Sequence, residues 1–153
     1  MLDIRRYQSA DRDSVWELHN AAIGPTGAHL GSDAWYDDVL HIEEVYLQNG
    51  GEYLVGEYEG QVVAMGALKR TTAERAEVKR MRVSPAYQGR GFGQAILEVL
   101  EQKAKELGYT TLHLDTGVTM VAAQKLYRKN GYQETSRGSI ADVDVIFFEK
   151  SIA

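Results

Sequence analysis

The chain has 153 residues, of which 44% are hydrophobic and 25% charged, so it fits one folded domain and global disorder is excluded. It contains no cysteine, which excludes disulfides, cysteine–zinc sites and a thiol nucleophile. The net charge is −5 and the one basic cluster, at residues 79–82, lies in a strand-like segment, so nucleic acid is a poor candidate partner.

Neither a secretory leader nor a membrane anchor is expected. Charged residues, among them Asp3, Arg5 and Asp11, interrupt residues 1–30 and leave no apolar core for a signal peptide. The best apolar run, Val62–Leu68, is far too short to span a bilayer. We therefore expect a soluble, cytoplasmic chain that forms one domain over residues 1–153 and binds neither nucleic acid nor membranes.

The first third of the chain contains a short strand and two helices. Residues 2–7 are the strand, and a helix begins at about Ser9, because apolar residues recur at helical spacing after it. Three glycines and a proline in residues 24–31 predict a loop. A second helix follows and ends at Gly50–Gly51, and its apolar stripe consists of Trp35, Val39, Ile42 and Tyr46.

The remaining chain alternates strands with two further helices. The second arm of the first hairpin is apolar on both faces, so we expect it to be central in the sheet. The predicted strands are 52–58, 61–68, 76–83, 110–116, 132–136 and 144–150, and the predicted helices end near Leu107 and cover 121–130. The order β-α-α-β-β-β-α-β-α-β-β predicts an α/β fold with helices packed on one sheet.

Three glycines at alternate positions, Gly89, Gly91 and Gly93, come directly before the first of these later helices. A glycine costs about 0.5–1 kcal/mol of stability relative to alanine inside a regular element, so three glycines at this place are expected to serve a function that offsets the cost. At a helix N-terminus, unpaired N–H groups and the helix dipole attract an anion, typically a phosphate. The segment is therefore either a phosphate-binding arm or a plain glycine-rich turn.

Two common phosphate-binding motifs are excluded. A P-loop needs G-x-x-x-x-G-K-[ST], and no lysine follows these glycines at that spacing. A dinucleotide fingerprint needs G-x-G-x-x-G, but Gln94 occupies the third glycine position and Ser84–Gln88 separate the strand from Gly89. The pattern that remains is Gln88-x-x-Gly91-x-Gly93.

This pattern resembles the pyrophosphate arm of the GNAT superfamily of acetyl-CoA-dependent N-acetyltransferases, whose signature is [Arg/Gln]-x-x-G-x-[Gly/Ala]. The element order also matches, and residues 122–132, AAQKLYRKNGY, resemble the later helix motif that usually ends in LYxxxGF. Two positions depart from the pattern: Tyr132 replaces a phenylalanine, and Met120 stands where members often have an asparagine that assists coenzyme contacts. The resemblance implies a GNAT-like α/β (α+β) fold with a mixed, mostly antiparallel sheet flanked by helices.

The resemblance also implies acetyl-CoA as cosubstrate, with no metal. The thioester would lie where the strand 76–83 splays from the next one, and the acceptor amine would arrive beside the 24–31 loop. Arg90 either adds a charge-assisted phosphate contact or is a solvated surface charge. The implied coenzyme-binding residues are Met81, Arg82 and Val83 for the pantetheine and Gln88, Gly89, Arg90, Gly91, Phe92 and Gly93 for the pyrophosphate.

Attack by an amine on the thioester needs a base and an acid. An alkylammonium has a pKa of about 10.4, so a base or a water chain must remove its proton. Glu77 is the candidate base, because some family members carry a glutamate there; otherwise it is a charged strand end. Alternation places it on the face that also carries Lys79, Met81 and Val83. Tyr127 matches the family's usual tyrosine and would protonate the departing thiolate; otherwise it is an amphipathic core tyrosine.

The other patterns are weaker. His113 and Asp115 alternate onto one strand face and could pair or bind a metal, but two ligands do not make a metal site, so a structural role is favoured. The sequence therefore predicts an N-acetyltransferase acting on a primary amine of a small molecule or peptide. A non-catalytic acyl-CoA-binding or regulatory domain is the alternative, and the choice between monomer and homodimer stays open.

Overall fold

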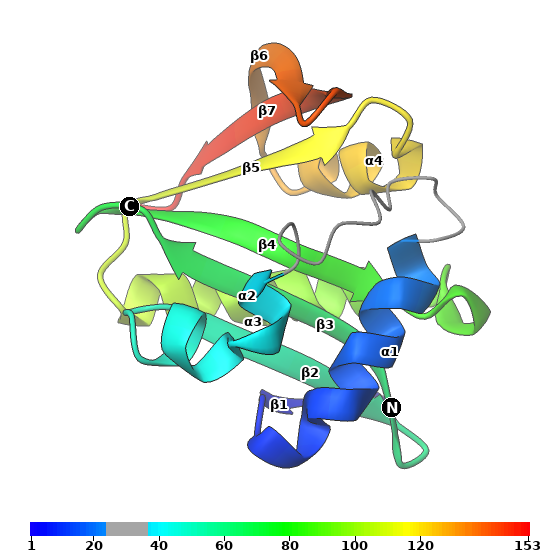
Figure 1. The fold of residues 1–153 in the computed structure, drawn as a ribbon. Helices are drawn as coiled ribbons and strands as arrows, with labels where there is room; N and C mark the ends of the chain where they lie inside the picture. The colour runs from blue at the N-terminus through cyan, green and yellow to red at the C-terminus, as the bar shows by residue number, and fades with distance from the viewer. Residues whose placement is uncertain (24–36) are drawn as a thin grey trace.

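In the part of the chain that the structure describes, residues 1–23 and 37–153 of a computed structural model, seven strands form one sheet in the order β1-β2-β3-β4-β5-β7-β6 (Figure 1). Neighbouring strands are antiparallel except β4 and β5, which are parallel. The predicted mixed, mostly antiparallel sheet is therefore confirmed. The strands are β1 Asp3–Arg6, β2 Glu52–Tyr58, β3 Gln61–Arg70, β4 Arg75–Val83, β5 Thr111–Gly117, β6 Gln133–Ile140 and β7 Val143–Ser151.

Helices cover both faces of the sheet (Figure 1). On one face lie α1 (Arg12–Ile23) and α2 (Asp37–Leu40), and on the other lies α3 (Phe92–Glu106), with α4 (Val121–Lys129) beside β5. Within the described residues, no helix combines the length and apolar character that crossing a bilayer requires.

The central strand β3 contributes to a hydrophobic core on each face of the sheet. Ala64 and Leu68 belong to the core under α3, whereas Met65 and Ala67 belong to the core under α1 and α2. All four side chains are fully buried. The expectation that this arm of the hairpin is central is therefore confirmed.

The predicted second helix is not one continuous helix. The structure has the short α2 and then a π-helical turn at Glu43–Leu47, where the N–H of Gln48 donates to the carbonyl of Glu43 at 2.8 Å. Its stripe residues Val39, Ile42 and Tyr46 are buried as expected. Trp35 and the predicted 24–31 loop lie outside the described residues. Packing of the stripe against the sheet thus overrides regular helical periodicity here.

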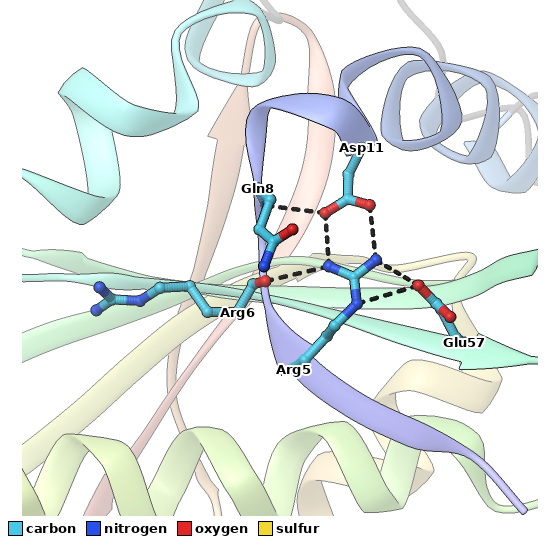
Figure 2. Close-up of polar contacts among 5 residues, drawn as sticks. All are labelled: Arg5, Arg6, Gln8, Asp11 and Glu57. Carbon is cyan, nitrogen blue, oxygen red and sulfur yellow. Dashed lines mark hydrogen bonds and ion pairs between the residues drawn. The ribbon is translucent and has the colours of Figure 1, made fainter.

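A charge network fixes the N-terminal edge of the sheet (Figure 2). The guanidinium of Arg5 on β1 donates to both carboxylate oxygens of Asp11 at 2.7 Å, and its Nε donates to Glu57 of β2 at 3.0 Å. Asp11 also accepts the backbone N–H of Gln8 at 2.8 Å, at the turn that leads into α1. The hydrogen bonds from Arg5 lower the pKa of Asp11. The network joins the start of α1 to the first two strands.

Candidate active site

The sheet opens between its two parallel strands. β4 pairs with β5 only at Arg75–Glu77, opposite Thr111–His113. Beyond that point β4 stays paired with β3 up to Val83, while β5 pairs with β7 up to Gly117. The predicted splay of these two strands is therefore confirmed, and it leaves a wedge between them.

A β-bulge lies in β4 along this wedge. Ala67 pairs with Lys79 and Met65 pairs with Arg82, so Arg80 and Met81 together stand opposite Gly66. Arg80 has a φ of 58°, in the left-handed region that non-glycine residues seldom occupy. Such a bulge inserts one extra residue, so the side-chain alternation of the strand reverses across it.

The bulge corrects one expectation about Glu77. Residues directly opposite each other on paired strands share a face, and Glu77 and Lys79 stand opposite Lys69 and Ala67, on the α1/α2 face. Beyond the bulge Met81 and Val83 pack against the core under α3. The prediction that Glu77 shares a face with these two residues was therefore wrong, because the inserted residue reverses the alternation between them.

Two of the three glycines have backbone conformations that other residues rarely adopt. Gly89 and Gly91 have φ of 80° and 82°, and a Cβ built on either would meet nothing within 4 Å. Gly91 is the N-cap of α3, and no side chain among the described residues caps it. Gly93 differs, because a Cβ there would lie 3.6 Å from Leu126 and 3.7 Å from Val83, at ordinary contact distances. The segment Gln88–Gly93, called the glycine arm below, therefore presents an open helix N-terminus, suited to an anion.

The arm forms one wall of a cavity of about 670 Å³. The end of β4 and α4 form the other walls, and the lining includes Met81, Arg82, Val83, Gln88, Gly89, Gly91, Phe92 and Gly93. Gln94 of α3, which lines this cavity, and Asn130 at the end of α4 exchange two side-chain hydrogen bonds of 2.7 and 2.8 Å. These bonds hold together the two helix ends that flank the cavity.

Arg90 lies over aromatic rings beside the arm. Its guanidinium carbon is 5.1 Å from the centre of the Tyr87 ring and 5.8 Å from that of Tyr58, and both rings also contact Phe92. The structure therefore gives Arg90 a stacking role that sequence reasoning missed, since Tyr58 comes from the distant β2 strand.

A second cavity, of about 340 Å³, lies at the wedge itself. Its lining includes the two carboxylates Glu77 and Asp115 together with Tyr127. The residues that line both cavities are Met81, Arg82, Met120, Ala123 and Tyr127. The cavity beside the arm therefore adjoins a second cavity whose lining contains two carboxylates and a phenol.

Burial changes the pKa values of two groups that line this second cavity, Tyr127 and Asp115. Burial raises the pKa of Tyr127 to about 12, although Arg82 lowers it and Asp115 adds to the rise. Burial and the nearby Glu77 carboxylate also raise the pKa of Asp115, against the opposing effects of Lys79, His113 and Arg80. At neutral pH the phenol therefore keeps its proton.

Asp115 is the functional candidate that sequence reasoning undervalued. Its expected neighbour His113 hydrogen-bonds with Thr71 at 2.7 Å, and burial lowers the pKa of His113. Asp115 stands two residues beyond His113, which pairs with Glu77, so both carboxylates face the same side of the wedge. Only the pairing of β4 with β5 reveals this placement. Within the described residues, no group of three or more His, Cys, Asp or Glu side chains could hold a metal ion.

The fold and the glycine arm define a class of acyl-coenzyme A-dependent transferases, and comparison with known proteins gives the family. Residues 12–132 match the model of the acetyltransferase (GNAT) family, so the chain belongs to this family.

Relatives of known sequence match part of the chain. The IAA acetyltransferase of Azospirillum brasilense is 39% identical over 83 residues, 54% of this chain and 54% of that protein. N-acetyltransferase 8 of Rattus norvegicus is 31% identical over 129 residues, 76% of this chain and 58% of that protein. The chain spans about half the length of the curated relatives it matches.

Solved structures share the whole fold. An acetyltransferase of the GNAT family from Staphylococcus aureus Mu50 superposes with a TM-score of 0.92 at 22% identity, over 100% of both chains. A putative acetyltransferase from Salmonella typhimurium, solved with acetyl-CoA, has a TM-score of 0.82 at 22% identity and covers 99% of this chain and 94% of its own. At these identities the likeness concerns the fold.

Proposed function

We propose that this chain transfers the acetyl group of acetyl-CoA to a primary amine of a small molecule or peptide by direct attack. One observation carries the proposal: the cavity along the glycine arm and the cavity at the wedge share Tyr127. A thioester that reaches from the first cavity into the second would meet this phenol and the two carboxylates. The cytoplasmic location expected from the sequence stays part of the proposal.

The residues present fit the coenzyme. The pyrophosphate would accept hydrogen bonds from backbone N–H groups of the arm, where Gly91 leaves open space in place of a side chain. The pantetheine would lie along the end of β4, whose pairing with β5 stops at Glu77. The proposed binding residues are those expected from the sequence, Met81, Arg82, Val83, Gln88, Gly89, Arg90, Gly91, Phe92 and Gly93.

Two carboxylates are available to take the ammonium proton. We propose Glu77 for this role, as the sequence suggests, with Asp115 as a second candidate, because Asp115 interacts electrostatically with both Glu77 and Tyr127. Once neutral, the amine nitrogen forms a bond to the thioester carbonyl carbon, and the carbon–sulfur bond then breaks. Tyr127 would donate its phenolic proton to the departing sulfur, and its phenolate would then take up the second proton that the nitrogen carries once it is bonded to carbon.

The test is a panel of primary amines with acetyl-CoA as donor and free thiol as readout. The panel should span amino acids, polyamines, amino sugars and lysine peptides. Thiol release that depends on one amine class, together with an N-acetylated product of matching mass, supports the proposal. Saturable acetyl-CoA binding without release of thiol for any amine would favour the alternative, a non-catalytic acyl-CoA-binding or regulatory domain.

A further inference from the structure

A buried ion pair joins α2 to the bulge in β4. The guanidinium of Arg80 donates through Nε to Asp38 Oδ2 at 2.9 Å and through Nη2 to Oδ1 at 2.5 Å, a bidentate arrangement. The side chains of Arg80 and Asp38 are only 9% and 12% exposed. The phenol of Tyr46 donates a further hydrogen bond to Asp38. Both partners come from segments far apart in the chain, so the contact is purely tertiary.

Burial of Asp38 and the backbone conformation of Arg80 are both unfavourable by themselves. Burial by itself would raise the pKa of Asp38, but the hydrogen bonds and charge of Arg80 hold it at about 2. Arg80 also occupies the left-handed region, with φ of 58°, where glycine would be the easier residue. Strained backbone of this kind persists only where the surroundings determine it, and it clusters at functional sites.

The bulge that holds Arg80 decides where the rest of β4 lies. Because of the inserted residue, Met81 and Val83 face α3, whereas Arg82 stands opposite Met65 and faces the α1/α2 side. These residues form the stretch on which the pantetheine would lie. Without the bulge, the backbone from Met81 to Val83 would shift its register against β3.

We propose that the Asp38–Arg80 ion pair is a positioning device that holds the β4 bulge, and thereby presents Met81–Val83 to the coenzyme. This inference rests on the proposed function in one respect, because one of its two readouts is the affinity for acetyl-CoA. Asp38 is not proposed to touch substrate, and Arg80, although it lines the wedge cavity, is proposed to act through the backbone of the coenzyme strand. The inference further implies that α2, on the opposite face of the sheet from α3, sets the affinity for acetyl-CoA.

The experiment is a rescue with two variants. In Asp38→Asn, the amide keeps the shape of the side chain and can still accept from Tyr46, but Arg80 loses the carboxylate that holds it. The arginine should then leave the left-handed conformation and flatten the bulge, so acetyl-CoA affinity measured by calorimetry should fall at least tenfold. In Asp38→Asn/Arg80→Gly, glycine takes the positive φ readily. Affinity should return to within about threefold of the wild type.

Amide hydrogen exchange of Met81–Val83, measured without coenzyme, gives a second readout that does not depend on the proposed function. Exchange should be faster in Asp38→Asn and return to the wild-type rate in the double variant. Arg75→Gln is the matched control, because it removes another β4 arginine whose pair, to Glu149 at 3.1 Å, is half-exposed, and it should change neither readout.

Two outcomes would overturn the positioning role. One is unchanged exchange in Asp38→Asn. The other is a double variant whose exchange is as fast as that of the single variant, because the pair would then serve only to pack α2. If the wild type binds no acetyl-CoA while the exchange rates follow the expected pattern, the proposed function fails and the positioning of the bulge stands.

Discussion

Removing the Tyr127 hydroxyl tests the proposed acid directly. The Tyr127 ring lies 5.6 Å from that of Tyr132 and 6.4 Å from that of Phe148, centre to centre, and the residue is buried. Tyr127→Phe keeps this ring packing and removes one oxygen. We therefore expect little change in thermal stability or in acetyl-CoA affinity, but a loss of about 10²–10⁴-fold in kcat, the usual contribution of general acid catalysis. In free energy this is about 3–5 kcal/mol of transition-state stabilisation.

The acidity of the phenol adds a sharper expectation. The pKa of Tyr127 is raised to about 12 by burial, whereas a thiol such as that of the coenzyme has a pKa of about 8.5. Proton transfer from the phenol to the free thiolate would thus be uphill by about 5 kcal/mol. The sulfur is less basic still while it is bonded to carbon, so the proton should move late, as the carbon–sulfur bond breaks. Because the folded phenol keeps its proton up to its raised pKa, the single-turnover rate should show no decline between pH 8 and about 11 that belongs to Tyr127.

The assay is single-turnover acetyl transfer by rapid quench for wild type, Tyr127→Phe and Tyr132→Phe. Tyr132 is the matched control, because it is a buried tyrosine of the same core whose hydroxyl donates to Glu101 at 2.9 Å. Tyr132→Phe should lower the melting temperature and leave the chemical step nearly unchanged. A wild-type rate of chemistry in Tyr127→Phe would refute the assignment, and early melting of that variant would show that Tyr127 is chiefly a core residue.

Four further outcomes are expected. Acetyl-CoA at a hundredfold excess over its Kd should stabilise the fold by about 2.7 kcal/mol, and an unmoved melting curve would contradict the cofactor assignment. Gly91→Val should abolish measurable coenzyme binding, whereas Gly108→Val, with a similar φ of 90° and equally open surroundings, should cost comparable stability without changing affinity. Glu77→Gln and Asp115→Asn should each lower activity mostly at low pH. A residue whose amide variant has the same pH–rate profile as the wild type is not the base. Asp115→Asn should also raise the melting temperature near pH 7, and in acid the two melting temperatures should become equal. The reason is that the pKa of Asp115 is raised in the folded state, so the wild type loses stability as the pH rises through this pKa. A reversed pH trend would contradict the burial argument.

The sequence by itself determined the features that depend on local backbone and local spacing. Helix α3 begins at Phe92, directly after Gly91, as the helical pattern that follows the glycines suggested. Tyr127 is buried and packs in the same core as Ala123, one helical turn before it, which agrees with an amphipathic tyrosine on α4. Conformational preference and helical periodicity act over a few residues, so they can be read without knowing the partner strands.

The tertiary structure alone decided which side chains meet at the wedge. The bulge at Arg80 separates Glu77 from the face of Met81. No local signal marks it, because Arg80 adopts a glycine-like conformation and its ion-pair partner, Asp38, is distant in the sequence. Likewise, Asp115 joins Glu77 in one cavity only because β4 and β5 pair in parallel and then part. Strand register is set by contacts between distant segments, and a shift of one residue moves every later side chain to the other face of the sheet.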